Sequence, residues 1–233
     1  MRRRRRDWCA VWIVCCLAAA ACSRTPQEPP PSAPPPASAA RQTEPLRPKI
    51  VVLGDSLSAG LGLPPQQAYP ALLQQKLDAE GRPWEVVNAG VSGDTSAAGL
   101  QRVDWALDEP GVRILILELG ANDGLRGLPV DEMKKNLAAI VERAQAKHLL
   151  VLLTGMEAPP NFGPEYVVSF RQVYADLAKR YKLPFLPFLL DKVAGVAALN
   201  QADGIHPTPE GHRVIADLVW RELRPMLTTA STS

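Results

Sequence analysis

Five short apolar segments lie between residues 49 and 190, and each leads toward a polar stretch that contains glycine. The segments are continuously apolar instead of alternating, which is typical of strands buried on both faces of a parallel sheet. Pro187 lies in the last segment and indicates an edge strand, because proline has no N–H to give to a central ladder. The pattern predicts strands over residues 49–53, 84–88, 112–119, 148–154 and 183–190.

Longer amphipathic segments separate these strands and predict helices. They read YPALLQQKLDAE, TSAAGLQRVDWALDE, PVDEMKKNLAAIVERAQAK and PEYVVSFRQVYADLAKRY, and a final helix is expected from about Pro209 to Arg224. Thr208 can cap this last helix, and Pro209 suits its first position. Alternating strands and helices favour right-handed crossovers, so the expected fold class is α/β, with a parallel sheet between two layers of helices.

The stretches beyond the strands carry the polar side chains. They read, in chain order, GDSLSAGLG, NAGVSGDTS, GANDGLRG, GMEAPPNFG and DGIHPTPEG. Ligands of such sheets bind beyond the carboxyl ends of the strands. The sequence therefore predicts a single site at that edge of the sheet.

The first 22 residues have the layout of a secretory signal: five arginines, a mostly apolar run from Trp8 to Ala21, and a small-residue end. The apolar run is shorter than the roughly 20 residues that a membrane-spanning helix needs. We therefore predict a signal peptide over residues 1–22 and export to the periplasm. A membrane anchor that is never removed is the alternative.

All four cysteines lie in this segment, so a disulfide within the mature chain is excluded; they are Cys9, Cys15, Cys16 and Cys22. Cys22 follows LAAAA and resembles the lipobox cysteine of bacterial lipoproteins, although Ala19 stands where leucine is usual. We expect lipidation of Cys22 and tethering to a membrane through this anchor alone. Ordinary cleavage nearby, which would leave a free periplasmic protein, stays open.

Residues 23–48 predict a disordered linker, because nine prolines between residues 26 and 48 stand among almost no apolar side chains except alanine. We predict that residues 49–227 form one domain, long enough to bury a hydrophobic core, and that residues 228–233 form a disordered tail. The formal charge of +2 comes from the leader: without Arg2–Arg6 and Asp7, 21 basic residues face 23 acidic ones. No basic run remains, so a nucleic-acid partner has no electrostatic support, and no protein partner is inferred.

The GDSLSAGLG stretch matches no common phosphate loop, since it lacks the Gly-Lys-Ser/Thr ending of a P-loop and the G-x-G-x-x-G pattern. A serine nucleophile needs a base and a group that orients the base. Of three histidines, His148 opens a strand at the wrong edge, and His212, at the start of the last helix, is expected at the surface or in packing. His206 lies at the right edge, and Asp203 precedes it in the same loop.

Other interpretations of these polar residues stay open. Asp203 and His206 alone are typical of a surface capping turn, and a metal site has no third cluster of ligands. Acyl transfer also needs donors for an oxyanion, and the N–H groups of Gly90 and Ser56 and the amide of Asn122 are candidates. Alone, Gly90 and Asn122 would be ordinary turn residues; their placement at successive strand ends favours a shared site.

Four of the stretches resemble the four sequence blocks of the GDSL, or SGNH, hydrolase family, in order and at family-like spacing: GDSLSAGLG, NAGVSGDTSAAGL, LELGANDGLRG and DGIHPT. The likeness is strongest to the bacterial periplasmic acyl-CoA thioesterase I, lysophospholipase and arylesterase group, and covers residues 49–227. It implies a three-layer, flavodoxin-like α/β/α sandwich with a five-stranded parallel sheet, and no cofactor or metal. Ser58 stands where the G-x-S-x-G elbow of α/β-hydrolases would have its second glycine.

The resemblance also implies roles for single residues. Ser56 would be the nucleophile, His206 the general base and Asp203 the group that orients it. The oxyanion hole would consist of the N–H groups of Ser56 and Gly90 and the side chain of Asn122. The implied activity is that of a secreted serine esterase, which hydrolyses acyl esters and thioesters through an acyl-enzyme.

Three acidic residues near these blocks are not assigned to the chemistry. Asp55 and Asp94 are expected to stiffen the loops around the oxyanion hole by hydrogen bonding. Glu118, within the third predicted strand, is expected to be a satisfied internal carboxylate.

The GMEAPPNFG loop places Met156 and Phe162 beside the predicted site, where they would form one wall of an acyl groove or simply anchor the loop. Such walls distinguish acyl chain lengths weakly, by about 1–3 kcal/mol per methylene. We therefore expect broad specificity for small-molecule acyl esters and thioesters. Deacylation of envelope sugars and non-enzymatic lipid or sugar binding are the alternatives.

Overall fold

The computed structural model describes residues 46–230, which belong to one compact unit. The predicted signal peptide, the lipidation of Cys22 and nearly all of the predicted linker lie outside the described residues. Among residues 46–230, no helix is both long and apolar enough to cross a bilayer.

A five-stranded parallel sheet forms the middle layer, with strand order β2-β1-β3-β4-β5. This is the flavodoxin-like order, so the predicted sheet is confirmed. The central strands are buried on both faces, as their continuous apolar runs require. The strands are β1 (Lys49–Gly54), β2 (Glu85–Gly90), β3 (Val112–Glu118), β4 (Leu150–Thr154) and β5 (Phe185–Leu186).

The last strand is an edge strand, as Pro187 indicated, but it is much shorter than the predicted segment. Pro184 and Pro187 stand on either side of Phe185–Leu186, and neither has an N–H for a ladder. The apolar residues beyond Pro187 leave the sheet and enter the loop that leads to the last helix.

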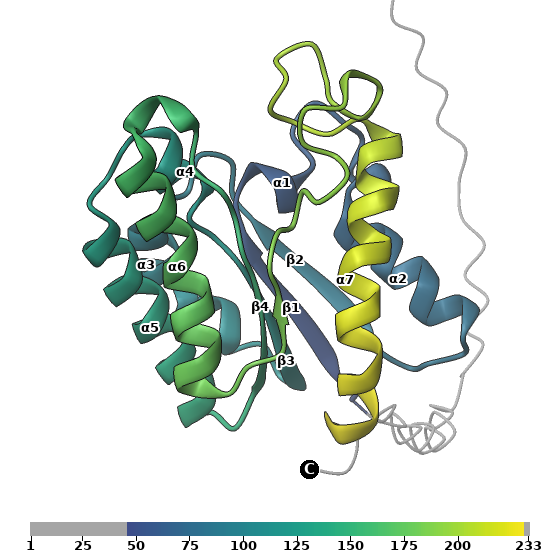
Figure 1. The fold of residues 1–233 in the computed structure, drawn as a ribbon. Helices are drawn as coiled ribbons and strands as arrows, with labels where there is room; N and C mark the ends of the chain where they lie inside the picture. The colour runs from purple at the N-terminus through teal and green to yellow at the C-terminus, as the bar shows by residue number, and fades with distance from the viewer. Residues whose placement is uncertain (1–45, 231–233) are drawn as a thin grey trace, which may run out of the picture. The chain divides into compact units, whose positions relative to one another are not determined.

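Helices cover both faces of the sheet (Figure 1). Helices α2 (Tyr69–Ala79) and α7 (Pro209–Ala230) pack together on one face. Helices α3 (Ser96–Leu107), α5 (Val130–Ala146) and α6 (Pro164–Tyr181) form the layer on the other face. The short elements are α1 (Ser56–Ala59), α4 (Ala121–Leu125), η1 (Pro65–Gln67), η2 (Pro160–Phe162) and η3 (Ala197–Leu199).

Helix α7 begins as predicted but ends later. Thr208 Oγ1 accepts the Gly211 N–H at 3.3 Å, and the helix continues through Pro225 to Ala230. The expected end at about Arg224 is therefore wrong, and residues 228–230 of the predicted tail are helical, whereas residues 231–233 lie outside the described residues. A proline inside a helix costs about 3 kcal/mol. Met226 and Leu227 are buried beyond it, and each such side chain contributes about 1.5–3 kcal/mol, which offsets that cost.

His212 faces the interior, in the first turns of α7. Its side chain is 1% exposed, its ring stacks on Tyr69, and its Nδ1 accepts the Tyr69 N–H at 3.2 Å. Burial, with a smaller contribution from His206, lowers the pKa of His212 from 6.5 to about 4. Of the roles expected for His212, the structure shows packing, by a neutral imidazole that joins α7 to the start of α2.

Acid should therefore destabilise the fold through His212. Between pH 6.5 and pH 4 the unfolded chain binds a proton that the folded imidazole refuses, so the free energy of unfolding falls as the pH falls. The pKa difference corresponds to about 3 kcal/mol. His212→Asn keeps an acceptor near the Nδ1 position but does not titrate, so we expect a smaller loss between pH 7 and pH 4 in urea unfolding.

His148→Asn is the matched control, since His148 is exposed and has a φ of 60°, which asparagine tolerates. It should lose as much stability as the wild type over the same pH range. Equal losses in the wild type and His212→Asn would contradict the prediction.

Candidate active site

Ser56 begins helix α1, directly after β1. Asp55 caps this helix, because its Oδ1 accepts the Leu57 N–H at 3.0 Å, and Gly60 ends it in the left-handed region with φ 74°. Within residues 46–230 the Ser56 N–H has no hydrogen-bond acceptor. β1 lies between β2 and β3, so Ser56 lies where the strand order reverses, the usual ligand position in such sheets.

His206 approaches Ser56 from the loop before α7. Its Nε2 lies 3.0 Å from Ser56 Oγ, and its Nδ1 lies 2.7 Å from Asp203 Oδ2. The other oxygen of Asp203 accepts the N–H groups of Ile205 and His206, at 2.9 and 3.0 Å. The structure therefore brings the three residues of the predicted triad into one chain of hydrogen bonds.

The charge on Asp203 is fixed by its own turn. The backbone N–H of His206, then the His206 ring, and then the Ile205 N–H hold the pKa of Asp203 well below its usual range. An ionised Asp203 accepts from Nδ1–H, and this leaves Nε2 free to accept the Ser56 hydroxyl proton.

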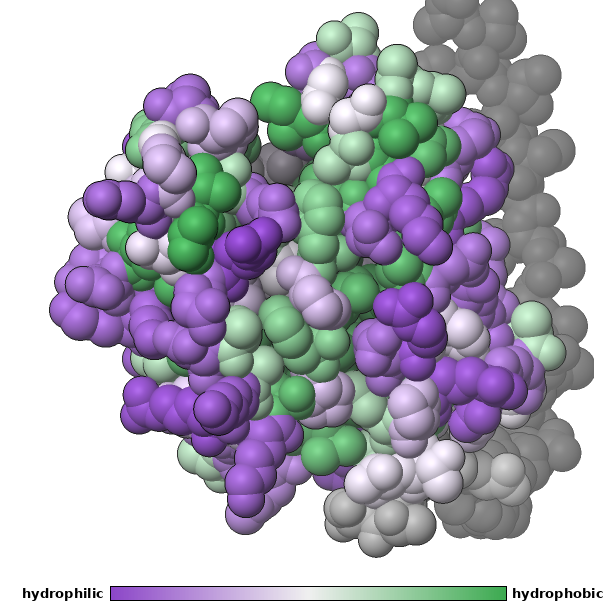
Figure 2. All heavy atoms as spheres, viewed as in Figure 1, coloured by the Kyte–Doolittle hydropathy of each residue, from purple (hydrophilic) through white to green (hydrophobic). Residues whose placement is uncertain are grey.

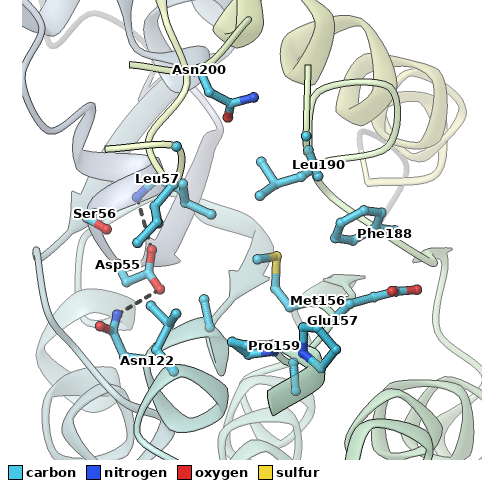
Figure 3. Close-up of a pocket in the computed structure, with 18 residues that line it drawn as sticks. Asp55, Ser56, Leu57, Asn122, Met156, Glu157, Pro159, Phe188, Leu190 and Asn200 are labelled. Carbon is cyan, nitrogen blue, oxygen red and sulfur yellow. Dashed lines mark hydrogen bonds between the residues drawn. The ribbon is translucent and has the colours of Figure 1, made fainter. Parts of the chain in front are cut away.

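Asn122, on α4, also reaches the site, but its amide is engaged. Its Nδ2 donates to Asp55 Oδ2 at 3.0 Å (Figure 3) and to the Asp94 carbonyl, also at 3.0 Å. Both hydrogens of the amide therefore have protein acceptors. The Asp94 side chain accepts from Arg102 at 2.6 Å, so both aspartates hydrogen-bond within the surrounding loops, as expected.

The expectation for Gly90 is wrong. Its N–H donates to Asn88 Oδ1 at 2.9 Å, so it is not available to a substrate. A Cβ atom at Gly90 would lie 2.5 Å from the Ala59 nitrogen and 2.8 Å from Ser58 Cβ. The glycine is needed because β2 packs closely against α1.

Gly93, in the same stretch, carries an N–H that the sequence analysis did not consider. It has a φ of +87°, and among residues 46–230 its N–H has no acceptor. The carbonyl of the next residue, Asp94, accepts from Asn122, so this loop lies against the Asn122 side chain. Its position three residues beyond the end of β2, in the loop instead of the ladder, was the available signal.

A cleft of about 430 Å³ opens beside Ser56 and Asn122. Figure 2 shows hydrophobic residues on both sides of a hollow, where the loop between β5 and α7 faces the α4 side in Figure 1. Met156 lines the cleft, as expected (Figure 3). The other large apolar side chains that line it are Leu57, Leu125, Phe188, Leu190 and Ile205.

Phe162 does not line the cleft, so this expectation is corrected. Its ring packs on Tyr166 with a centroid separation of 5.3 Å, and it fills the space above Gly127. Helix η2 directs this side chain toward the stacked aromatic residues of α6, which are Tyr166, Phe170 and Tyr174. Phe188, from the apolar segment after β5, contributes the aromatic wall instead.

Glu118 and Asp55 form a buried acidic pair beneath the site. Glu118 Oε2 accepts the Asp55 N–H at 3.2 Å and the Ser58 hydroxyl at 2.7 Å, whereas Oε1 has no partner among the described residues. The carboxyl group is thus only half satisfied, which corrects the expectation. Burial raises the pKa of Asp55 to about 6, and burial, followed by the charge of Asp55, raises that of Glu118 well above its usual range.

Residues 52–214 match the model of the GDSL-like lipase/acylhydrolase family. The chain belongs to this family. It is 44% identical over 178 residues to esterase TesA of Pseudomonas aeruginosa, and the matched region covers 76% of this chain and 89% of that protein. It is 38% identical over 178 residues to thioesterase 1/protease 1/lysophospholipase L1 of Escherichia coli (strain K12), which covers 76% of this chain and 84% of that protein.

A solved structure agrees with this assignment. The psychrotrophic esterase EstA from Pseudoalteromonas sp., inhibited by monoethylphosphonate, superimposes with a TM-score of 0.74 at 36% identity. The match covers 77% of this chain and 98% of that one. The family resemblance expected from the sequence is confirmed, and with it the enzyme class, a hydrolase that acts on ester bonds.

Gly90→Ala tests whether Gly90 serves packing. The added methyl group meets backbone atoms, which cannot move aside as a flexible side chain can, so we expect a loss of at least about 2 kcal/mol in the free energy of unfolding. Urea denaturation measures it. Gly81→Ala is the control: its φ is +64° with nothing within 4 Å, so only backbone strain of about 1 kcal/mol is added. Wild-type stability in Gly90→Ala would refute the packing role.

Proposed function

We propose that the protein is an exported serine hydrolase that cleaves acyl esters and thioesters through an acyl-enzyme. The observation that carries the proposal is the hydrogen-bonded path from Asp203 through His206 to Ser56, at the mouth of an apolar cleft. The names of the relatives, an esterase and a thioesterase/lysophospholipase, support the same chemistry.

In the first half-reaction, Ser56 Oγ attacks the carbonyl carbon while His206 Nε2 takes its proton. Asp203 stabilises the resulting imidazolium, which then gives the proton to the departing alcohol or thiol as the bond to the acyl group breaks. In the second half-reaction, water attacks the carbonyl carbon of the acyl-enzyme while His206 accepts a proton from that water. The bond to Ser56 Oγ then breaks, and the carboxylic acid leaves. Ser56 Oγ recovers its proton from His206.

The negative charge on the carbonyl oxygen requires donors in each half-reaction. The N–H groups of Ser56 and Gly93 are free for this role, and Asn122 Nδ2 would exchange its bond to Asp55 for one to the oxyanion. The removal of one such donor costs about 3 kcal/mol in comparable enzymes. Gly93 takes the place that the sequence analysis gave to Gly90.

The acyl chain would lie along Met156, Phe188 and Leu190, where the cleft is apolar (Figure 3). Apart from the polar residues beside Ser56, its lining is apolar except for Glu157 and Asn200, which disfavours deacylation of envelope glycans. Non-enzymatic lipid or sugar binding is also disfavoured, because it does not require the hydrogen-bonded path from Asp203 through His206 to Ser56.

The proposal includes the predicted arrangement of the chain: a signal peptide over residues 1–22, a linker over residues 23–48 and the hydrolase domain from residue 49. Lipidation of Cys22 would tether that domain to a membrane. Mass spectrometry of the mature N-terminus tests this, because a diacylglyceryl-modified Cys22 supports the anchor and an unmodified N-terminus beyond Cys22 excludes it.

A fluorophosphonate probe should label the wild type at Ser56 and leave Ser56→Ala unlabelled, because only an activated hydroxyl attacks phosphorus. Asp203→Asn should retain the fold and lower kcat for p-nitrophenyl acetate by about 10³–10⁴, since it disturbs the imidazole tautomer. Ser169→Ala, on the exposed surface of α6, is the matched control and should be labelled and active.

Failure of the folded wild type to react with the probe would defeat the proposal. Turnover of p-nitrophenyl esters of increasing chain length, beside an acetylated glycan, then defines the substrate class. We expect activity with the esters and little dependence on chain length.

A further inference from the structure

Arg102, on α3, makes three directed hydrogen bonds at the edge of the sheet that carries Ser56. Its Nε donates to Asp94 Oδ2 at 2.6 Å, Nη1 to the Ala89 carbonyl at 2.6 Å, and Nη2 to the Gly54 carbonyl at 2.9 Å. A planar guanidinium presents these donors in a rigid fork. One side chain therefore fixes three backbone segments relative to one another.

Two of the acceptors are carbonyls at the ends of β1 and β2, and the third is the side chain of Asp94 in the loop after β2. Gly54 is the last residue of β1, two positions before Ser56. Ala89 lies near the end of β2, and Asp94 directly follows Gly93. The distance between the Ser56 and Gly93 N–H groups is thus set by how the β1 end and the Gly93 loop are held together.

The same contacts continue to the third donor. The carbonyl of Asp94 accepts from Asn122 Nδ2, and Asn122 also donates to Asp55, the residue before Ser56. Arg102, Asp94, Asn122 and Asp55 therefore form an unbroken path around the proposed oxyanion position.

Burial distinguishes this ion pair from the others. The Arg102 and Asp94 side chains are 19% and 13% exposed, and no other ion pair among residues 46–230 has both partners below a fifth. Exposed pairs contribute little, whereas a partly desolvated, hydrogen-bonded pair holds its geometry firmly.

We propose that Arg102 is a positioning residue, whose guanidinium holds the Gly93 N–H and the Asn122 amide in register with the Ser56 N–H. The inference rests on the proposed function. Arg102 does not touch the substrate, and it acts through the loops that do. Lysine preserves the charge but offers a single point donor in place of the fork, so Arg102→Lys separates geometry from charge.

The first measurement is steady-state hydrolysis of p-nitrophenyl acetate by Arg102→Lys. We expect kcat to fall by about 10- to 100-fold, since small misplacement of catalytic groups costs this much, while KM changes less than threefold. The second is the affinity for a trifluoromethyl ketone, whose adduct with Ser56 carries an oxyanion. The affinity of Arg102→Lys for this ketone should fall in proportion to its kcat/KM. Its affinity for a fatty-acid product, which has no oxyanion of this kind, should equal that of the wild type.

Arg143→Lys is the matched control. Arg143 also reaches α3, at the Leu100 carbonyl and Asp104, but it is 43% exposed and its acceptors lie within the helix layer. Its kinetics should stay within twofold of the wild type. Asp94→Asn is the second variant, in case Arg102→Lys folds poorly: it weakens the pair, leaves the two carbonyl bonds, and should give a smaller loss of kcat.

Two outcomes would overturn the inference: unchanged kcat and analogue affinity in folded Arg102→Lys and Asp94→Asn, or a rise in KM alone. Labelling of the wild type by a fluorophosphonate separates this failure from failure of the proposed function. A labelled, active wild type with an indifferent Arg102→Lys variant rejects the role of Arg102 and leaves the hydrolase proposal standing.

Discussion

The lack of room at the end of β1 constrains the rest of the site. A Cβ atom on Gly54 would lie 2.1 Å from Ser58 Oγ and 2.4 Å from Glu118 Oε2, so only glycine fits. This close approach lets Glu118 on β3 accept hydrogen bonds from Asp55 and Ser58, on either side of Ser56. The turn after β1 is thereby clamped to the neighbouring strand, and the first residue of α1 is fixed where His206 can reach it.

That clamp has an electrostatic cost. Asp55 and Glu118 are fully buried, and neither has an ion pair among residues 46–230. Burial of a carboxylate is unfavourable, which is why the pKa values of both groups are raised. An all-apolar turn would be more stable by itself but could not hold the N–H groups and hydroxyl of this edge in place. The large core around the sheet offsets the loss.

Features that depend on the local sequence pattern could be predicted, whereas features that depend on tertiary packing could not. The positions of β1 and β4 are visible because burial on both faces leaves an apolar run in each segment. The end of α7 is not, since the helix passes Pro225 only because its apolar face continues into the core. Gly90 and Gly93 stand in one stretch, and which N–H is free depends on Asn88. Phe162 and Phe188 are both aromatic, but only η2 and the course of the chain after β5 decide which lines the cleft.

Asp203 and Asp55 both lie near Ser56, and their surroundings give them different roles. Asp203 is half exposed and accepts from the His206 ring and from two backbone N–H groups of its own turn, so its pKa lies well below its usual range. Asp55 is buried, has no hydrogen bond to the imidazole among residues 46–230, and has a pKa that burial raises to about 6. A base that must bear a positive charge in each turnover needs a partner that stays ionised at every working pH, which Asp203 provides and Asp55 does not. The DGIHP loop thus secures the charge of its carboxylate by two backbone N–H groups and the His206 ring, and an aspartate three residues from the histidine suffices without support from a distant element.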